Sequence, residues 1–135
     1  MPLAQAVAHA PLLPGVYMAR EGATGPVVYV GMAGERRGQG VRGRLNVYFR
    51  GKVLVSGLGE AAMDRALADP VWLRERLADV EAGRPDRAKV WGQAALARAE
   101  LHVRWATVSD RAGAVALERE VLTALRDQDL WNRLR

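Results

Sequence analysis

A glutamate near the end of the chain lies among apolar residues, in a setting where a carboxylate can do chemistry. At about 100° per residue, five apolar side chains between positions 115 and 125 cover one continuous arc of a helix. Glu118 falls inside that arc, whereas Glu120 lies on the outer, polar side. A carboxylate in an apolar setting is costly unless it is paired with a cation, protonated or bound to a metal ion. Glu118 is therefore either a residue at the edge of the core that pairs with an arginine, or part of a functional site.

Positive charge is concentrated in one stretch, residues 14–58. The chain of 135 residues has 20 Lys and Arg against 15 Asp and Glu, a formal net charge of +5. The stretch has seven basic and two acidic residues, which accounts for the whole excess. Most of the seven are arginines, whose planar guanidinium suits two-point contacts with phosphate, so we expect a polyanionic partner. They are Arg20, Arg36, Arg37, Arg42, Arg44, Arg50 and Lys52.

The elements that position these residues begin with a predicted hairpin. Residues 13–19 and 27–32 are rich in β-branched residues and tyrosine, and the segment between them contains glycine and proline in a turn-forming order. A glycine-rich basic loop over residues 34–43 then leads into a short helix over residues 41–50. Residues 1–12 are small and apolar without a clear period, and we expect them to be a loosely held lead-in.

Residues 57–99 predict a series of helices. Asp69 and Pro70 have the residue types of an N-cap and a first helical position, and glycine and proline at 83 and 85 separate two further helices. The first of these helices carries one apolar stripe, formed by Trp72, Leu73, Leu77 and Val80. Residues 101–108 then alternate as a third strand, and Ser109-Asp110 caps a final helix over residues 112–126.

These elements predict an α/β fold in a single domain over residues 1–135. A short, mainly antiparallel three-stranded sheet is flanked by helices, and residues 57–99 form a helical insertion. The chain has no cysteine, so it has no disulfide and no thiolate metal site. No apolar run approaches the ~20 residues that span a bilayer. We therefore expect no membrane association and a cytoplasmic location.

The hairpin also carries a pair of motifs. Gly15-Val16-Tyr17 ends one predicted strand and Tyr29-Val30-Gly31 ends the next. These resemble the paired motifs of the GIY-YIG nuclease family, and three further elements follow in that family's order. They are Arg44 with Tyr48 four residues later, Leu117-Glu118, and Leu130-Trp131-Asn132. The likeness around residues 29–49 is greatest to the nuclease domain of the bacterial nucleotide-excision-repair incision subunit.

The resemblance implies a metal-dependent DNA endonuclease, a hydrolase of phosphodiester bonds. It implies that Glu118 holds one Mg²⁺ or Mn²⁺ and that Arg44 holds the scissile phosphate. Tyr17 and Tyr29 would flank the attacking water, with Tyr29 favoured as the general base. The catalytic residues implied are Tyr17, Tyr29, Arg44, Tyr48, Glu118 and Asn132, with Tyr48 supporting the network and Asn132 bracing the site. Contacts to DNA phosphates would come from Arg36, Arg37, Arg42, Arg50 and Lys52.

Two departures from the family pattern keep alternatives open. Met32 stands where the repair nucleases have lysine, and the spacing from Glu118 to Asn132 is two residues longer than theirs, a spacing that Glu120 would restore. One alternative is a catalytically impaired nucleic-acid-binding module on the same fold. Another is a structural or interaction protein in which Glu118 merely pairs with Arg44. DNA or RNA as substrate, a role in repair, restriction or mobile-element maintenance, and a homodimer or a protein partner all stay open.

Overall fold

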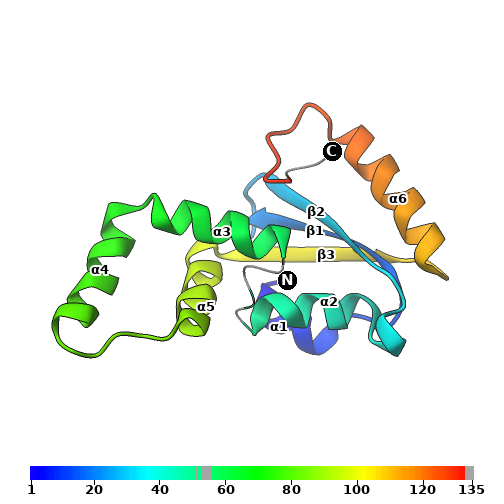
Figure 1. Cartoon of the computed structure of the whole chain (residues 1–135). Helices are drawn as coiled ribbons and strands as arrows, with labels where there is room; N and C mark the ends of the chain where they lie inside the picture. Colours follow the sequence, from blue (N-terminus) through cyan, green and yellow to red (C-terminus); the bar gives the residue numbers. More distant parts are fainter. Residues whose placement is uncertain (51, 53–55, 133–135) are drawn as a thin grey trace.

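The structure is a computed structural model and describes residues 1–50, 52 and 56–132. The elements follow the order expected from the sequence, with one additional helix at the N-terminus (Figure 1). They are α1 (Leu3–His9), β1 (Gly15–Glu21), β2 (Val27–Ala33), a 3-10 turn η1 (Arg36–Gly38), α2 (Gly40–Phe49), α3 (Gly57–Leu67), α4 (Pro70–Glu81), α5 (Ala88–Ala99), β3 (Leu101–Thr107) and α6 (Arg111–Ala124).

The three strands form one antiparallel sheet in the order β2-β1-β3, which confirms the predicted hairpin and third strand. Tyr17 on β1 lies opposite Gly31 on β2 and opposite Trp105 on β3. The first strand begins later than predicted because the carbonyl of Leu13 accepts a hydrogen bond from the amide of Val41 on α2. That residue therefore joins the first strand to α2 and takes no part in the sheet.

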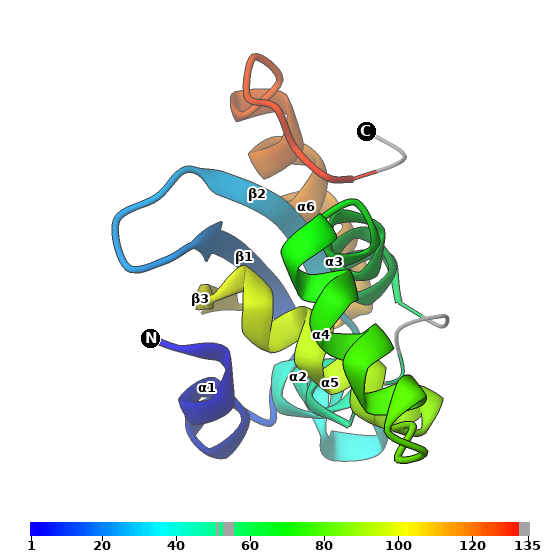
Figure 2. The same cartoon turned by 90° about the vertical axis from the view of Figure 1, so that its left-hand side faces the viewer.

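Helices cover both faces of this sheet. Figures 1 and 2 show α6 on one side and α1 and α2 on the other. On the α6 side, Leu117 and Val121 pack against Val16 and Val30 of the strands. The opposite face carries the larger core, to which α1, α2, α3 and α5 contribute. Because β2 is at the edge of the sheet, residues from both faces can reach its outer side.

Residues 1–12 are a correction to the sequence-based prediction, because they include an ordered helix. Ala6 and Ala10 are fully buried in the larger core. The amino group of Met1 donates to the carbonyl of Val103, and the carbonyl of Met1 accepts from the amide of Val103. The side chain of Arg42 on α2 donates to the carbonyl of Ala10 at 2.7 Å. The buried contacts of α1 are made largely by alanines, which allow close approach but give too little periodicity to reveal a helix of seven residues.

The helices predicted for residues 57–99 are α3, α4 and α5, of which α4 lies farthest from the sheet (Figure 1). Asp69 caps α4, with its carboxylate accepting hydrogen bonds from the amides of Val71 and Trp72. Trp72 packs edge-to-face on Trp91 of α5 with ring centroids 5.5 Å apart.

The predicted apolar stripe of α4 is only half correct. Trp72 is buried, whereas Leu77 and Val80 remain 55% and 48% exposed. Helix α4 forms the outer end of the three-helix extension, so that only its first turns meet α3 and α5 (Figure 1). Periodicity indicates that a stripe exists but not what covers it. None of the helices formed by the described residues combines the length and apolar character needed to cross a membrane.

Candidate active site

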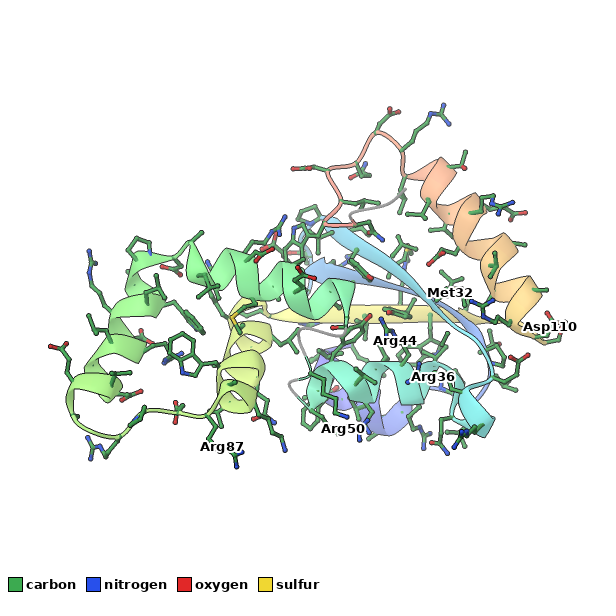
Figure 3. All side chains as sticks on the ribbon, in the orientation of Figure 1. Met32, Arg36, Arg44, Arg50, Arg87 and Asp110 are labelled. Carbon is green, nitrogen blue, oxygen red and sulfur yellow. The ribbon has the colours of Figure 1, made fainter. Side chains whose placement is uncertain are left out.

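A cavity of about 420 Å³ opens at the outer edge of β2, where side chains from four elements meet. Tyr17 of β1, Tyr29 of β2, Arg44 of α2 and Glu118 of α6 all line it. Arg44 extends from α2 toward the sheet (Figure 3). The structure therefore brings together four of the six residues to which the sequence assigns catalytic roles, although they come from both ends of the chain.

The tyrosines form a buried cluster behind the cavity. The hydroxyl groups of Tyr17 and Tyr48 hydrogen-bond to each other, and their ring centroids lie 6.1 Å apart. The ring of Tyr29 lies 6.4 Å from that of Tyr17. A Cβ atom at Gly31 would collide with the Tyr17 ring, so only glycine leaves room for this packing. Tyr48 thus supports the cavity from behind through Tyr17.

Arg44 is the cation of this cluster. Its guanidinium lies 5.1 Å from the ring centroid of Tyr48, one helical turn further along α2, which is a cation–π contact. Burial lowers the pKa of Arg44, but the neighbouring phenols of Tyr48 and Tyr17 raise it by more, so the net shift is upward. A permanently charged guanidinium therefore lies in the cavity wall, where it can contact an anion.

Burial has the opposite consequence for the tyrosines. Burial, with a contribution from Tyr29, raises the pKa of Tyr17 to about 12 although Arg44 opposes the shift. The pKa values of Tyr29 and Tyr48 are also raised, in both cases chiefly by burial. All three are therefore neutral phenols at pH 7, able to donate a hydrogen bond. Tyr29 differs from the other two tyrosines in what adjoins its hydroxyl. Gly57, the first residue of α3, lies so near that a Cβ atom there would be 2.7 Å from the Tyr29 hydroxyl. The positive N-terminal end of α3 therefore adjoins this phenol.

Glu118 faces the same cavity from the other side of the sheet edge. Its side chain is half-buried, and burial raises the pKa of its carboxyl group. Among the described residues, no hydrogen bond or ion pair to Glu118 is present, so the pairing with Arg44 that the sequence left open is not formed. Glu120 is exposed and does not line the cavity. The half-buried carboxylate is thus free to accept a ligand.

Asn132 acts on β2 and not in the cavity. Its side-chain amide donates to the carbonyl of Val30 at 2.7 Å, and its oxygen accepts from the amide of Val30 at 3.1 Å. The amide of Trp131 donates to the carbonyl of Val28. The C-terminal segment therefore holds the backbone on both sides of Tyr29, which is the bracing role expected for this asparagine.

Two further charged residues in the cavity were not foreseen from the sequence. Glu35 and Arg111 line it, and the carboxylate of Glu35 accepts a hydrogen bond from the backbone amide of Arg111 at 3.0 Å. Their separation of 76 residues gives no sequence signal. Met32 also lines the wall and brings no charge, but the guanidinium of Arg111 brings one nearby.

The four arginines and one lysine expected to contact nucleic acid do not form one patch. Arg36 lines the cavity and has left-handed backbone geometry, with φ of 48°, as does Arg37, with φ of 55°. Such geometry costs a non-glycine residue about 1 kcal/mol and is common at functional sites. Arg50 lies at the opposite end of α2 from Arg36, with the exposed Lys52 just beyond it (Figure 3). Arg42 is half-buried, and its Nε donates to the carbonyl of Ala10, so part of its guanidinium is already hydrogen-bonded within the protein.

The donors available to a metal ion are oxygen atoms. The described part of the chain contains no group of three or more His, Asp or Glu side chains that could hold a metal ion alone. Glu118 offers one carboxylate, and such a site suits a hard cation whose other ligands are phosphate and water.

No protein-family model, curated protein or solved structure matches this chain.

Proposed function

We propose that the protein is a divalent-metal-dependent endonuclease of the GIY-YIG type that hydrolyses phosphodiester bonds in DNA. One observation carries the proposal: Tyr17, Tyr29, Arg44 and Glu118 converge on one cavity from four separate elements. Hydrolysis of a phosphodiester requires a cationic contact for the nonbridging oxygens, groups that orient water and a stabilised leaving oxygen. The cavity offers side chains of each required type.

The cavity is suited to an anionic group. Arg44, Arg36 and Arg111 line it together, and Arg44 is held between α2 and the sheet by its stacking on Tyr48. A guanidinium fixed in this way can contact two phosphate oxygens with little further loss of side-chain freedom. We therefore assign Arg44 the scissile phosphate, and Arg36 and Arg111 the flanking charge.

Tyrosine hydroxyls would order the water and the phosphate. The neutral phenols of Tyr17 and Tyr29 can donate hydrogen bonds to a phosphate oxygen or hold a water beside it. Tyr29 is the candidate general base, and it must lose the proton on its hydroxyl to act. Burial raises the pKa of Tyr29 on balance; Arg44 opposes this rise, and the N-terminal end of α3 beside the hydroxyl acts in the same direction as Arg44.

Glu118 is the residue that would hold the metal ion. A half-buried carboxylate without a partner among the described residues carries an uncompensated negative charge, which a bound cation would relieve. When bound, Mg²⁺ or Mn²⁺ supplies positive charge to the phosphate oxygens and to the leaving oxygen. Glu35, on the same wall, remains tied to the first amide of α6.

A second candidate function is a DNA-binding module on this fold without turnover. Met32 in the cavity wall favours it, because a thioether cannot assist a phosphoryl group electrostatically. This module would bind DNA in a salt-sensitive manner through its arginines and cleave nothing.

Incubation with supercoiled plasmid and a panel of branched DNAs tests the proposal. Wild-type protein and Glu118→Gln are compared in Mg²⁺ or Mn²⁺, with EDTA as control. Nicking that needs the metal and is lost in the variant supports the endonuclease. Salt-sensitive binding by both proteins with no cleavage of any substrate supports the binding module, and the absence of DNA binding at low salt contradicts both.

A further inference from the structure

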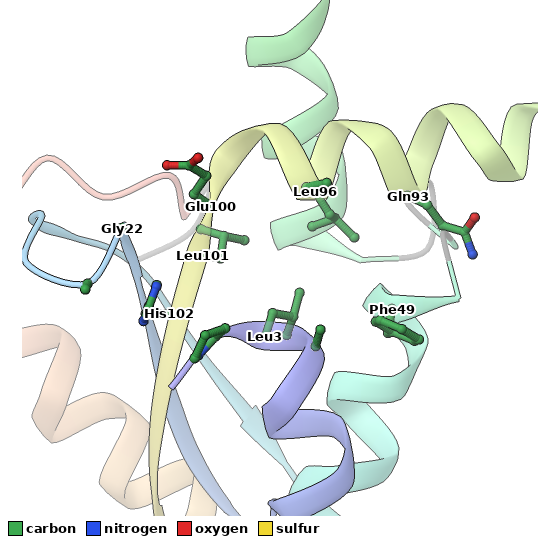
Figure 4. A pocket seen from close by; sticks show the side chains of 12 residues that line it. Leu3, Gly22, Phe49, Gln93, Leu96, Glu100, Leu101 and His102 are labelled. Atoms are coloured by element: carbon green, nitrogen blue, oxygen red, sulfur yellow. The ribbon is translucent and has the colours of Figure 1, made fainter.

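A second cavity, of about 710 Å³, lies between α1, α5 and the C-terminal end of α2 (Figure 4). Its walls are mainly apolar, with Leu3, Leu96 and Leu101 facing Phe49 across the space. Phe49 is 47% exposed, so its ring is accessible from the cavity. This volume and lining are those of a ligand site and exceed what imperfect packing leaves in a small domain.

The polar groups of this cavity restrict what it can hold. Gln93, Glu100 and His102 line it, and no Lys or Arg does so among the described residues. An anionic group inside would therefore meet a carboxylate and no cation. A neutral, flat ring system fits better, because it can stack on Phe49 and exchange hydrogen bonds with an amide, a carboxylate and an imidazole.

The charges outside the cavity indicate what carries that ring. Arg50 and Lys52 follow Phe49 directly in the chain, and both are exposed. On the same helix, Arg44 lines the catalytic cavity five residues before Phe49, which is about 7 Å along the helix axis. Exposed cations beside an apolar cavity suit a ligand whose ring enters and whose phosphates remain outside.

We propose that the second cavity takes an unpaired nucleobase of the DNA, while Arg50 and Lys52 contact the adjoining phosphates. This inference rests on the proposed function and narrows its substrate. A base in a cavity has left its stack and its partner, which costs least where the DNA is already unpaired. The preferred substrate is therefore DNA with a single-stranded flap or branch, in preference to perfect duplex.

A fluorescent base analogue in the DNA tests this placement. Glu118→Gln protein, which keeps the DNA intact, is titrated with flapped DNA carrying 2-aminopurine in the flap. We expect binding to change the fluorescence and flap DNA to bind more tightly than duplex. Phe49→Ala in the same background should lose the fluorescence change and weaken flap binding roughly tenfold, with little effect on duplex.

Two further variants keep the result independent of folding. Ala97→Phe adds a ring inside the cavity at an exposed position of α5 and should reproduce the effect of Phe49→Ala. Leu77→Ala removes an equally exposed apolar side chain from α4, far from the cavity, and should change nothing.

The failure of this inference can be told apart from failure of the proposed function. If wild-type protein cleaves flapped DNA in a metal-dependent way, and Phe49→Ala and Ala97→Phe leave both the fluorescence change and the flap preference intact, the cavity does not hold a base. If the protein neither binds nor cleaves DNA, the nuclease proposal fails and this inference falls with it.

Discussion

The two cavities adjoin the same helix but have opposite chemistry. The cavity at the edge of β2 combines three arginines with two glutamates and two phenols, whereas the cavity at the end of α2 has apolar walls and no cation among the described residues. Partly buried charged groups lose favourable interactions with water, which costs free energy, whereas buried apolar side chains carry no such cost. The difference supports the proposals that the first cavity acts on a charged group and that the second holds a neutral one.

The largest expected difference in cleavage rate is between variants of Arg44, which lies within α2, and of Arg50, which follows its last residue. Arg44→Ala should lower the single-turnover cleavage rate by roughly 100- to 1,000-fold, because it removes the fixed charge at the scissile phosphate. Arg50→Ala should change that rate little while weakening DNA binding and lowering the slope of log affinity against log salt by about 1. Equal effects of the two variants on the cleavage rate would contradict the different roles proposed for Arg44 and Arg50.

Gly31→Ala tests how tightly the first cavity is packed. A methyl group at this position would push into the ring of Tyr17, so the free energy of unfolding should fall by about 1–3 kcal/mol, as measured by urea denaturation. Cleavage should fall with it, since Tyr17 would be displaced. Gly83 has open space around it but a left-handed backbone, and Gly83→Ala should cost only about 1 kcal/mol and spare cleavage. A Gly31→Ala protein of unchanged stability would show that the tyrosines are not packed as described.

Asn132→Ala tests the brace behind the cavity. The substitution leaves the amide and the carbonyl of Val30 without their partner, so the free energy of unfolding should fall by about 1–2 kcal/mol. Cleavage should fall less than in Arg44→Ala, because Asn132 holds Tyr29 only through the backbone. Asn132→Asp, which keeps the acceptor and loses the donor, should lie between the two proteins in stability. A loss of activity as complete as that of Arg44→Ala would place Asn132 in the catalytic chemistry.

The pH dependence of stability gives the smallest expected effect. Burial raises the pKa of Glu118 above its unfolded value, so the folded protein favours the protonated form and loses stability as pH rises through that pKa. Without added metal, Glu118→Gln should therefore be slightly more stable than wild type at pH 7. The difference should vanish below about pH 4, where both states are protonated. A less stable variant at pH 7 would point instead to a structural ion pair.

The sequence predicted the parts of this fold that depend on local chemistry. The hairpin follows from two adjacent strand-forming segments and the turn between them. The caps of α4 at Asp69 and of α6 at Asp110 each follow from residues within one helical turn. Helical periodicity also separated Glu118 from Glu120, because the difference between them is one of face. These signals depend on neighbours in the chain and need no knowledge of the tertiary structure.

The remaining features depend on contacts between distant residues. The pairing of Glu35 with Arg111 and that of Asn132 with Val30 join residues 76 and 102 positions apart. The same holds for the second cavity, whose walls come from segments that lie between positions 2 and 102. Residue types alone do not predict such contacts, because nothing in the sequence around one partner indicates the position of the other.

Two glutamates on different faces of α6 decide whether hydrolysis takes place at the edge of β2. Single-turnover cleavage of a labelled branched DNA in Mg²⁺ is measured for Glu118→Gln and Glu120→Gln. Glu118→Gln should lose at least about 100-fold in rate. Glu120→Gln, at an exposed position, should stay within about twofold of wild type. Equal rates for Glu118→Gln and wild type, or a loss confined to Glu120→Gln, would contradict the account.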